Sequence, residues 1–268
     1  MTAIDLVVTD LDGTLWEHPD HTPARTLEAV AEVESRGIPL LVATGRRLGS
    51  TRRPLEAIGL RPPAVMLNGS LGVHLASDER FHLGGFSSES AARILATFTD
   101  AGLEPCVYVD DDTHPVRIGQ LPATHDDHLA SFGGDVREDD LAAVVETHRV
   151  LAFSVLGIPE PAAVPLGDAL ARAGEPHVAP DRSYGGFGVT VAPPGDSKWD
   201  GIAAFCALEG LDPDRVLVIG DGPNDIEMLE AAAIAVVPED GHASALALAD
   251  HVCARAEVGG WAELLDLL

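Results

Sequence analysis

Cysteine is scarce in this sequence, and the three cysteines present, Cys106, Cys206 and Cys253, stand far apart. Because no C-x-x-C pair occurs, neither a zinc ribbon nor a disulfide framework is predicted. Basic residues are also few, since 17 Lys and Arg stand against 43 Asp and Glu, for a formal net charge of −26. Such a surface repels nucleic acid and anionic lipid, so we expect neither as a partner. An anionic ligand would need a locally positive pocket, which gives weight to each Lys or Arg near a motif.

Long apolar runs are absent as well, and none approaches the roughly 20 residues of a membrane-spanning helix. The segment from Met1 to Asp5 lacks the basic-then-apolar order of a signal peptide. We therefore predict a cytoplasmic protein with no membrane partner. With 268 residues, 46% of them hydrophobic, the chain can form one large domain or two modest ones.

The two ends of the chain share one pattern, in which short apolar runs alternate with amphipathic stretches. Thr22 and Pro23 indicate a helix start with Thr22 as the N-cap, and Gly37 indicates its end. The alternation of strand and helix predicts a doubly wound, Rossmann-like parallel sheet of the α/β class. Strands are expected at 4–9, 38–43, 64–67, 215–219, 233–237 and 251–253, and helices at 52–58, 198–208, 224–231, 243–249 and 261–267.

The middle of the chain contains further strand and helix patterns. Helices are expected at 88–100, 141–148 and 161–173, strands at 104–109 and 150–156, and an irregular loop at 110–127. The simplest arrangement has the chain leave the core after its third strand and return near Pro193-Pro194-Gly195. We predict a core of residues 1–81 and 192–268 with an inserted α/β domain of residues 82–191.

Asp10-Leu11-Asp12-Gly13-Thr14 follows the first expected strand directly. Ligands of doubly wound sheets bind at the carboxyl ends of strands, and in an extended chain Asp10 and Asp12 would point to the same side. Paired carboxylates can hold Mg²⁺, and one of them can attack phosphorus to form an acyl phosphate. The second can act as a general acid and base, and Gly13 permits a sharp turn. An ordinary Asp-Gly turn is the alternative interpretation of this motif.

The other expected strands of the core end in polar groups too. Thr44-Gly45-Arg46 follows the second strand and Asn68 follows the third, where hydroxyl, amide and backbone N–H groups can bind phosphate oxygens. Lys198 opens a helix against the dipole preference for acids, which suggests that it neutralises a phosphoryl group. Asp221, Asn224 and Asp225 follow the fourth strand, where a helix cap explains one acid but not both. All of these groups should meet at one edge of one sheet.

These motifs resemble those of the haloacid dehalogenase (HAD) superfamily, in its Cof-type branch of phosphatases with a large α/β (C2-type) cap. The resemblance is strongest in residues 10–15 and 220–229, and it implies that Asp10 is the nucleophile and Asp12 the general acid and base. It implies phosphate binding by Thr44, Gly45, Arg46, Asn68, Lys198 and Asn224, and Mg²⁺ binding by Asp10, the Asp12 backbone, Asp221 and Asp225. Trp16 departs from the family pattern, where an aliphatic residue is common.

The resemblance implies a Mg²⁺-dependent hydrolase of small phosphorylated metabolites, with sugar phosphates as the expected substrates and an aspartyl phosphate as the intermediate. Arg182 is a candidate substrate contact in the inserted domain. A phosphosugar mutase, with the same nucleophile and metal site, is the nearest alternative. A receiver-type signalling module is a more distant one, because such a module is about half this length and takes its phosphorylated Asp from a later strand.

Overall fold

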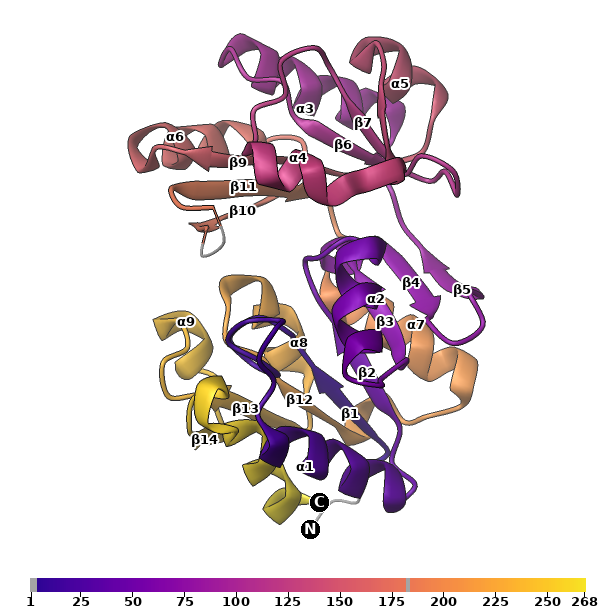
Figure 1. Ribbon diagram of the computed structural model, residues 1–268, viewed down its shortest axis with the longest axis vertical. Coiled ribbons are helices and arrows are strands. Elements are labelled where there is room, and N and C mark those ends of the chain that lie inside the picture. The colour runs from indigo at the N-terminus through magenta and orange to yellow at the C-terminus, as the bar shows by residue number, and fades with distance from the viewer. Residues whose placement is uncertain (1–3, 182–183) are drawn as a thin grey trace. The chain divides into compact units, whose positions relative to one another are not determined.

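The computed structural model of the chain describes residues 4–181 and 184–268 (Figure 1). The chain forms two compact units, one comprising Met1–Leu83 and Ser197–Leu268 and the other Gly84–Asp196. We call them the core unit and the inserted unit. The predicted domain boundaries follow residues 81 and 191, whereas the two compact units divide after Leu83 and Asp196. That the inserted unit serves as a cap stays a prediction.

The core unit contains an eight-stranded sheet whose order is β14-β13-β12-β1-β2-β3-β4-β5. The strands from β14 to β3 run parallel, with β1 at the centre between β12 and β2. This is the predicted doubly wound, Rossmann-like arrangement. The strands are β1 (Leu6–Thr9), β2 (Leu40–Ala43), β3 (Pro63–Met66), β4 (Leu71–His74), β5 (Arg80–Leu83), β12 (Val216–Ile219), β13 (Ile234–Pro238) and β14 (His251–Cys253).

The antiparallel hairpin of β4 and β5 was not predicted, since the chain was expected to leave the core after its third strand. Gly72 lies in the middle of β4, and glycine weakens a strand on propensity alone. In the fold that glycine is required, because a Cβ there would lie 2.4 Å from the Phe81 ring. The hairpin therefore depends on pairing with β3 and on the packing of Phe81, which no local pattern reveals.

Helices cover both faces of this sheet (Figure 1). Helices α7 and α8 pack on one face, while α1 and the 3₁₀ helix at Gly260–Leu267 pack together on the other. The α-helices are α1 (Ala24–Ser35), α2 (Leu48–Ala57), α7 (Lys198–Glu209), α8 (Ile226–Ala231) and α9 (Ala243–Leu246). Short 3₁₀ helices occur at Leu67–Gly69, Pro213–Arg215, Pro223–Asp225 and Ala256–Val258.

Several helix predictions differ in detail from the structure; for example, the helices expected to end at residues 173 and 249 end at Leu170 and Leu246. Pro23, not Thr22, occupies the N-cap of α1, and no side chain caps that helix. Helix α2 begins at Leu48, one turn earlier than expected, and the closing helix is 3₁₀ rather than α. Helix ends are set by tertiary contacts as well as by local signals, so boundaries are the least predictable part of an element.

The inserted unit is built on a six-stranded sheet in the order β10-β11-β9-β6-β7-β8. Its strands are β6 (Cys106–Val109), β7 (Val116–Ile118), β8 (Val136–Glu138), β9 (Val150–Ile158), β10 (Glu175–Pro180) and β11 (Phe187–Ala192). Its helices are α3 (Ser88–Asp100), α4 (Asp126–Phe132), α5 (Leu141–Thr147) and α6 (Glu160–Leu170), with a 3₁₀ turn at Gly133–Asp135. The segment 110–127, expected to be an irregular loop, contains β7 and the start of α4.

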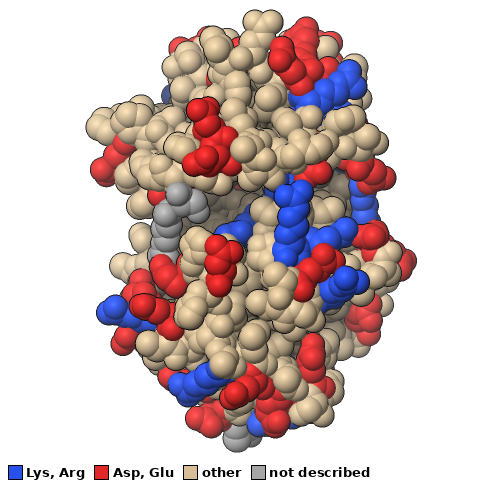
Figure 2. Space-filling model, in the orientation of Figure 1, with Lys and Arg blue, Asp and Glu red and all other residues tan. Residues whose placement is uncertain are grey.

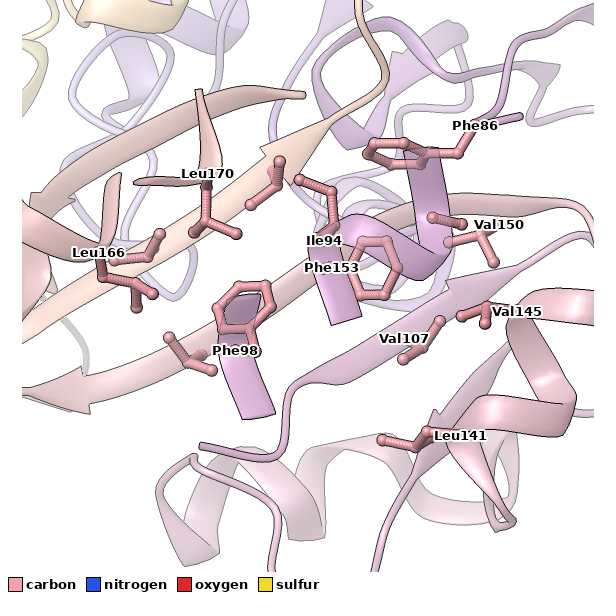
Figure 3. Close-up of a cluster of buried hydrophobic side chains, with 14 of the residues drawn as sticks. Phe86, Ile94, Phe98, Val107, Leu141, Val145, Val150, Phe153, Leu166 and Leu170 are labelled. Atoms are coloured by element: carbon pink, nitrogen blue, oxygen red, sulfur yellow. The ribbon is translucent and has the colours of Figure 1, made fainter. Parts of the chain in front are cut away.

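Aromatic and branched side chains fill the core of the inserted unit (Figure 3). Phe153 on β9 lies at its centre, with ring centroids 5.3 Å from Phe86 and 6.2 Å from Phe98. Ile94 and Phe98 point inward from one face of α3, as their spacing of four residues predicts. Burial of each such side chain contributes about 1.5–3 kcal/mol to stability. The inserted unit thus has a hydrophobic core of its own.

The surface carries the acidic excess of the sequence. On the face shown in Figure 2, Asp and Glu side chains are scattered over both units and do not form one patch. Along the part of the chain that the structure describes, we find no helix with both the length and the hydropathy to cross a bilayer.

Candidate active site

The predicted polar groups lie at the carboxyl ends of four strands of the core sheet. Asp10 follows β1, Thr44 follows β2, Asn68 follows β3 and Asp221 follows β12. Because β1 lies between β12 and β2 and β3 follows β2, these strand ends are neighbours in the sheet. The structure therefore brings the polar groups to one edge, as the parallel topology requires.

Lys198 lies at the centre of this group and is only 1% exposed. Its Nζ donates to Oδ1 of Asp10 at 2.8 Å and to Oδ1 of Asp225 at 2.6 Å. Sequence alone could not show this contact, because 188 residues separate Lys198 from Asp10. A buried cation between two carboxylates is held by charge-assisted hydrogen bonds, which are the stronger kind in proteins.

A helix cap places Lys198 at this point. Ser197 and Asp200 form a capping box, in which the Asp200 side chain accepts from the Ser197 N–H at 2.8 Å. Lys198 is the first residue of α7, so its long side chain can reach back over the strand ends. Gly69 lies against the same turn, and a Cβ on it would be 2.1 Å from the Ser197 carbonyl oxygen. The Ser197-x-x-Asp200 pattern was a readable helix start that the sequence analysis did not use.

The turn after β12 is organised by Asp225. Its Oδ2 accepts from the backbone N–H groups of Asp221 and Gly222 at 2.9 and 2.8 Å, while its Oδ1 binds Lys198. A Cβ on Gly220 would lie 2.7 Å from the Asp225 carboxyl carbon, so glycine is needed there. Both oxygens of Asp225 are thus engaged by the protein, an arrangement that favours a supporting role over direct metal ligation.

Asp10, Asp221 and Asp225 offer carboxylate oxygens that lie within 4.8 Å of one another. Asp10 is 7% exposed, and Asp221 accepts from the Thr14 hydroxyl at 3.0 Å. Thr14 was not assigned a role from the sequence, although it belongs to the first motif. Oxygen ligands at this density suit a hard divalent cation such as Mg²⁺.

Charge at this edge is unevenly balanced. Burial raises the pKa of the Asp10 carboxyl; Lys198 offsets part of this effect, whereas Asp225, Asp221 and Asp12 add to it. Burial alone would lower the pKa of Lys198, but the carboxylates of Asp10 and Asp225 together raise it above its ordinary value. Lys198 thus stays charged, and one cation serves several acids. A bound divalent cation would relieve the remaining repulsion.

Asp12 has a different environment from Asp10. The chain curls at Leu11, whose carbonyl oxygen accepts from the N–H groups of Thr14, Leu15 and Trp16, so it is not extended beyond β1. Both Asp12 oxygens bind Arg46, with Nε to Oδ2 at 2.5 Å and Nη2 to Oδ1 at 2.6 Å. The Trp16 indole N–H donates to Oδ1 at 3.1 Å. The Asp12 side chain is 41% exposed, so part of it remains accessible.

The remaining strand ends are linked by four further residues, Thr44, Gly45, Asn68 and Asn224. Thr44 is buried, and its hydroxyl accepts from the Arg46 N–H at 3.2 Å. Asn68 is in the left-handed region with φ 55°, which Asn tolerates better than most residues, and its Oδ1 accepts from Asn224 Nδ2 at 2.9 Å. A Cβ on Gly45 would lie 2.9 Å from that same Asn68 oxygen. Their predicted phosphate contacts stay predictions.

The predicted contact Arg182 lies outside the described residues. Tyr184, two residues later in the sequence, stacks on His125 with ring centroids 5.3 Å apart, within the inserted unit. The His125 ring also accepts from the Asp127 N–H and so caps α4.

Comparison with known proteins defines the class of this site. A family model described as haloacid dehalogenase-like hydrolase matches residues 7–265. The chain belongs to this family, and the prediction of a HAD-superfamily hydrolase with a Rossmann-like core is confirmed.

Several known proteins are similar to this one over most of its length. A phosphoglycolate phosphatase of Methanopyrus kandleri is 26% identical over 247 residues, which cover 92% of this chain and 89% of that protein. Among solved structures, the HAD subclass IIB sugar phosphatase BT4131 is 21% identical, with a TM-score of 0.76 and 98% of each chain covered. BT1666 of Bacteroides thetaiotaomicron is 20% identical with a TM-score of 0.79, covering 99% of this chain and 95% of that one. The phosphatase names support the predicted enzyme class, and the structural neighbours share the fold.

Proposed function

We propose that this protein hydrolyses phosphate monoesters of small metabolites, with Asp10 as the nucleophile. The single observation that carries the proposal is the buried contact of Lys198 with Asp10 at 2.8 Å, beside a carboxylate of Asp221. A carboxylate in a pocket that holds a fixed cation can approach an anionic phosphoryl group, which it would otherwise repel.

Each residue has a defined task in this proposal. Asp10 attacks phosphorus and forms an acyl phosphate, while Lys198 and the Thr44 hydroxyl bind the phosphoryl oxygens. Asp12 protonates the leaving oxygen and then takes a proton from the water that hydrolyses the acyl phosphate. Asp225 holds Lys198 in place, and Asn224 and Asn68 brace the strand ends. Most of the rate enhancement would come from positioning and charge neutralisation, as in phosphoryl transfer generally.

Asp10, Asp221 and the backbone carbonyl of Asp12 would hold Mg²⁺, with Asp225 in support. The fit rests on the donor set, because carboxylate oxygens of Asp10, Asp221 and Asp225 lie within 4.8 Å of one another, and Lys198 contacts two of these acids, Asp10 and Asp225. When bound, Mg²⁺ supplies charge neutralisation for the phosphoryl group.

Sugar phosphates are the proposed substrates. Support comes from a relative named for phosphoglycolate, a small phosphorylated acid, and from a neighbour of the same fold named as a sugar phosphatase. We propose that the inserted unit supplies selectivity as a cap. A mutase would use the same groups but return the phosphoryl group to a second hydroxyl, so its product would be an isomeric phosphosugar.

A phosphate-release screen tests the proposal. Purified protein is incubated with a panel of sugar, nucleotide and carboxylic-acid phosphates, with Mg²⁺ and with EDTA. We expect release of inorganic phosphate from at least one sugar phosphate, abolished by EDTA. Isomeric phosphosugars in place of inorganic phosphate would indicate the mutase.

Asp10→Asn is the decisive variant. We expect turnover to fall by at least about 10³-fold, because the amide cannot form the acyl phosphate. The circular dichroism spectrum should be unchanged, since Asn has the same shape. Ordinary turnover by this variant would exclude Asp10 as the nucleophile.

A further inference from the structure

Trp16 lies directly after the first motif, and its side chain is fully buried. The curled segment after β1 sets its position, because the Gly13 N–H donates to the Trp16 carbonyl oxygen at 2.8 Å and Gly13 has φ 81°. Burial on all sides leaves the indole little freedom to rotate. Its N–H is therefore a fixed donor, aimed at Oδ1 of Asp12.

Arg46 is held from two further directions. Its Nη1 donates to the Ser50 carbonyl oxygen at 3.1 Å, and its guanidinium carbon lies 6.0 Å from the centre of the Trp16 ring. That distance is at the outer limit of a cation–π contact. The guanidinium therefore forms a bidentate pair with the Asp12 carboxylate, and its contacts with Ser50 and Trp16 set its orientation.

We infer that Trp16 and Arg46 are positioning residues that hold the Asp12 carboxylate for proton transfer. The inference rests on the proposed function, in which Asp12 is the general acid and base. Three hydrogen bonds from two anchored side chains select one rotamer of Asp12, so its oxygens meet the leaving group in a constant direction. In a partly exposed carboxylate without these donors, several rotamers would compete, and only a fraction would be productive.

This role differs from the phosphate binding predicted for Arg46 from the sequence. Its guanidinium is already engaged with both oxygens of Asp12, so its effect on the reaction passes through that residue. For Trp16, neither packing alone nor shaping of the substrate entrance accounts for an indole N–H that donates to the Asp12 carboxylate.

Trp16→Phe tests the inference, with Trp261→Phe as a matched control. Trp261 is also fully buried and also donates one indole hydrogen bond, at 3.0 Å to the Thr9 hydroxyl. Each substitution keeps an aromatic ring and removes one N–H donor. Arg46→Lys is the second variant; it keeps the charge, loses the fork, and changes a side chain that is 21% exposed.

The readout is the dependence on the leaving group. An alkyl phosphate needs a proton on its leaving oxygen, whereas p-nitrophenyl phosphate leaves readily without one. We expect Trp16→Phe and Arg46→Lys to lower kcat/KM about tenfold for the best alkyl phosphate of the panel and less than about threefold for p-nitrophenyl phosphate. Trp261→Phe should leave the ratio of the two values unchanged.

The combined Trp16→Phe, Arg46→Lys variant completes the test. Because both residues act through one carboxylate, their effects should be less than additive. An equal loss for both substrates, or a raised KM with unchanged kcat, would overturn the inference in favour of a packing or entrance role. Failure of the proposed function looks different, because the unsubstituted protein would then release no phosphate from either ester.

Discussion

The two units of this protein differ in how far their buried charges are compensated by charges of opposite sign. In the core unit, Lys198 is shared by Asp10 and Asp225, with Asp221 close by, so negative charge is in excess at the strand ends. In the inserted unit, the buried Arg117 meets Asp111 at 2.6 Å and Asp139 at 3.0 Å, and Arg137 also meets Asp139 at 3.2 Å, so two cations face two acids. Excess negative charge at the strand ends of the core unit is typical of a reactive site. The balanced ion pairs around Arg117 in the inserted unit are typical of a structural anchor, and we call Arg117 and its two acidic partners the anchor.

The anchor has a clear physical effect on its surroundings. Backbone N–H groups of His114 and Thr113, together with Arg117, hold the pKa of Asp111 well below its ordinary range. Asp111 therefore stays ionised at any physiological pH. The two ion pairs join β7 to the loop before it, through Asp111, and to the end of β8, through Asp139, so they help to order a segment that was expected to be irregular.

Removing the anchor should have the largest effect on stability. Arg117→Met is expected to lower the free energy of unfolding by about 3–5 kcal/mol, because two carboxylates lose their buried partner. Arg137→Met is the control, since Arg137 also contacts Asp139, at 3.2 Å, but its side chain is 57% exposed. Arg137→Met should lower the free energy of unfolding by about 1 kcal/mol or less. Urea denaturation measures both, and equal losses would remove the contrast between the units.

Gly69→Ala sharpens the comparison at the site itself. Gly69 has φ 117° and no room for a Cβ beside Ser197, whereas Gly59 has φ 82° and open space. Both substitutions strain the backbone by about 1–2 kcal/mol. Only Gly69→Ala should also push Lys198 away from Asp10, and a shift of about 1 Å can lower kcat by roughly 10²-fold. Thermal unfolding and phosphate release, measured on both variants, separate strain from function. An active Gly69→Ala enzyme would show that the turn does not control Lys198.

Asp10→Asn should have the smallest effect on stability of the three substitutions. Unlike the other two, it should stabilise the protein. The pKa of Asp10 is raised in the folded state, chiefly by burial, so its contribution to stability is full below about pH 4 and is lost as pH rises through the folded-state pKa. Asn does not titrate. In EDTA at pH 7.5, the variant is therefore expected to melt about 2–4 °C above the unsubstituted protein.

The advantage of Asp10→Asn should shrink toward pH 4, where Asp10 binds its proton. It should also shrink on addition of Mg²⁺, which stabilises a protein that binds it. Asp168→Asn, at an exposed position on α6, is the control for loss of one charge. A lower melting temperature for Asp10→Asn in EDTA would mean that the core unit uses this charge as an anchor, like Arg117 in the inserted unit.

Much of the core unit was predictable because its signals are local. Short runs of three to six residues marked the parallel strands, and polar residues after four of them marked the edge where the candidate site lies. The β4–β5 hairpin and the strands β7 and β8 were not predictable in this way. Gly72 and Arg117 contradict strand and burial preferences, and only Phe81, Asp111 and Asp139 explain why they fit.

The sequence by itself determined the chemistry that this protein carries, because Asp10, Thr44, Lys198 and Asp221 each follow or open an element whose pattern is local. Only the tertiary structure decided which groups contact one another. It paired Lys198 with Asp10 and Asp225, and it turned Arg46 onto Asp12. The reason is that hydrogen bonds and charge interactions depend on distances of a few ångström, and these are set by chain segments far apart in sequence.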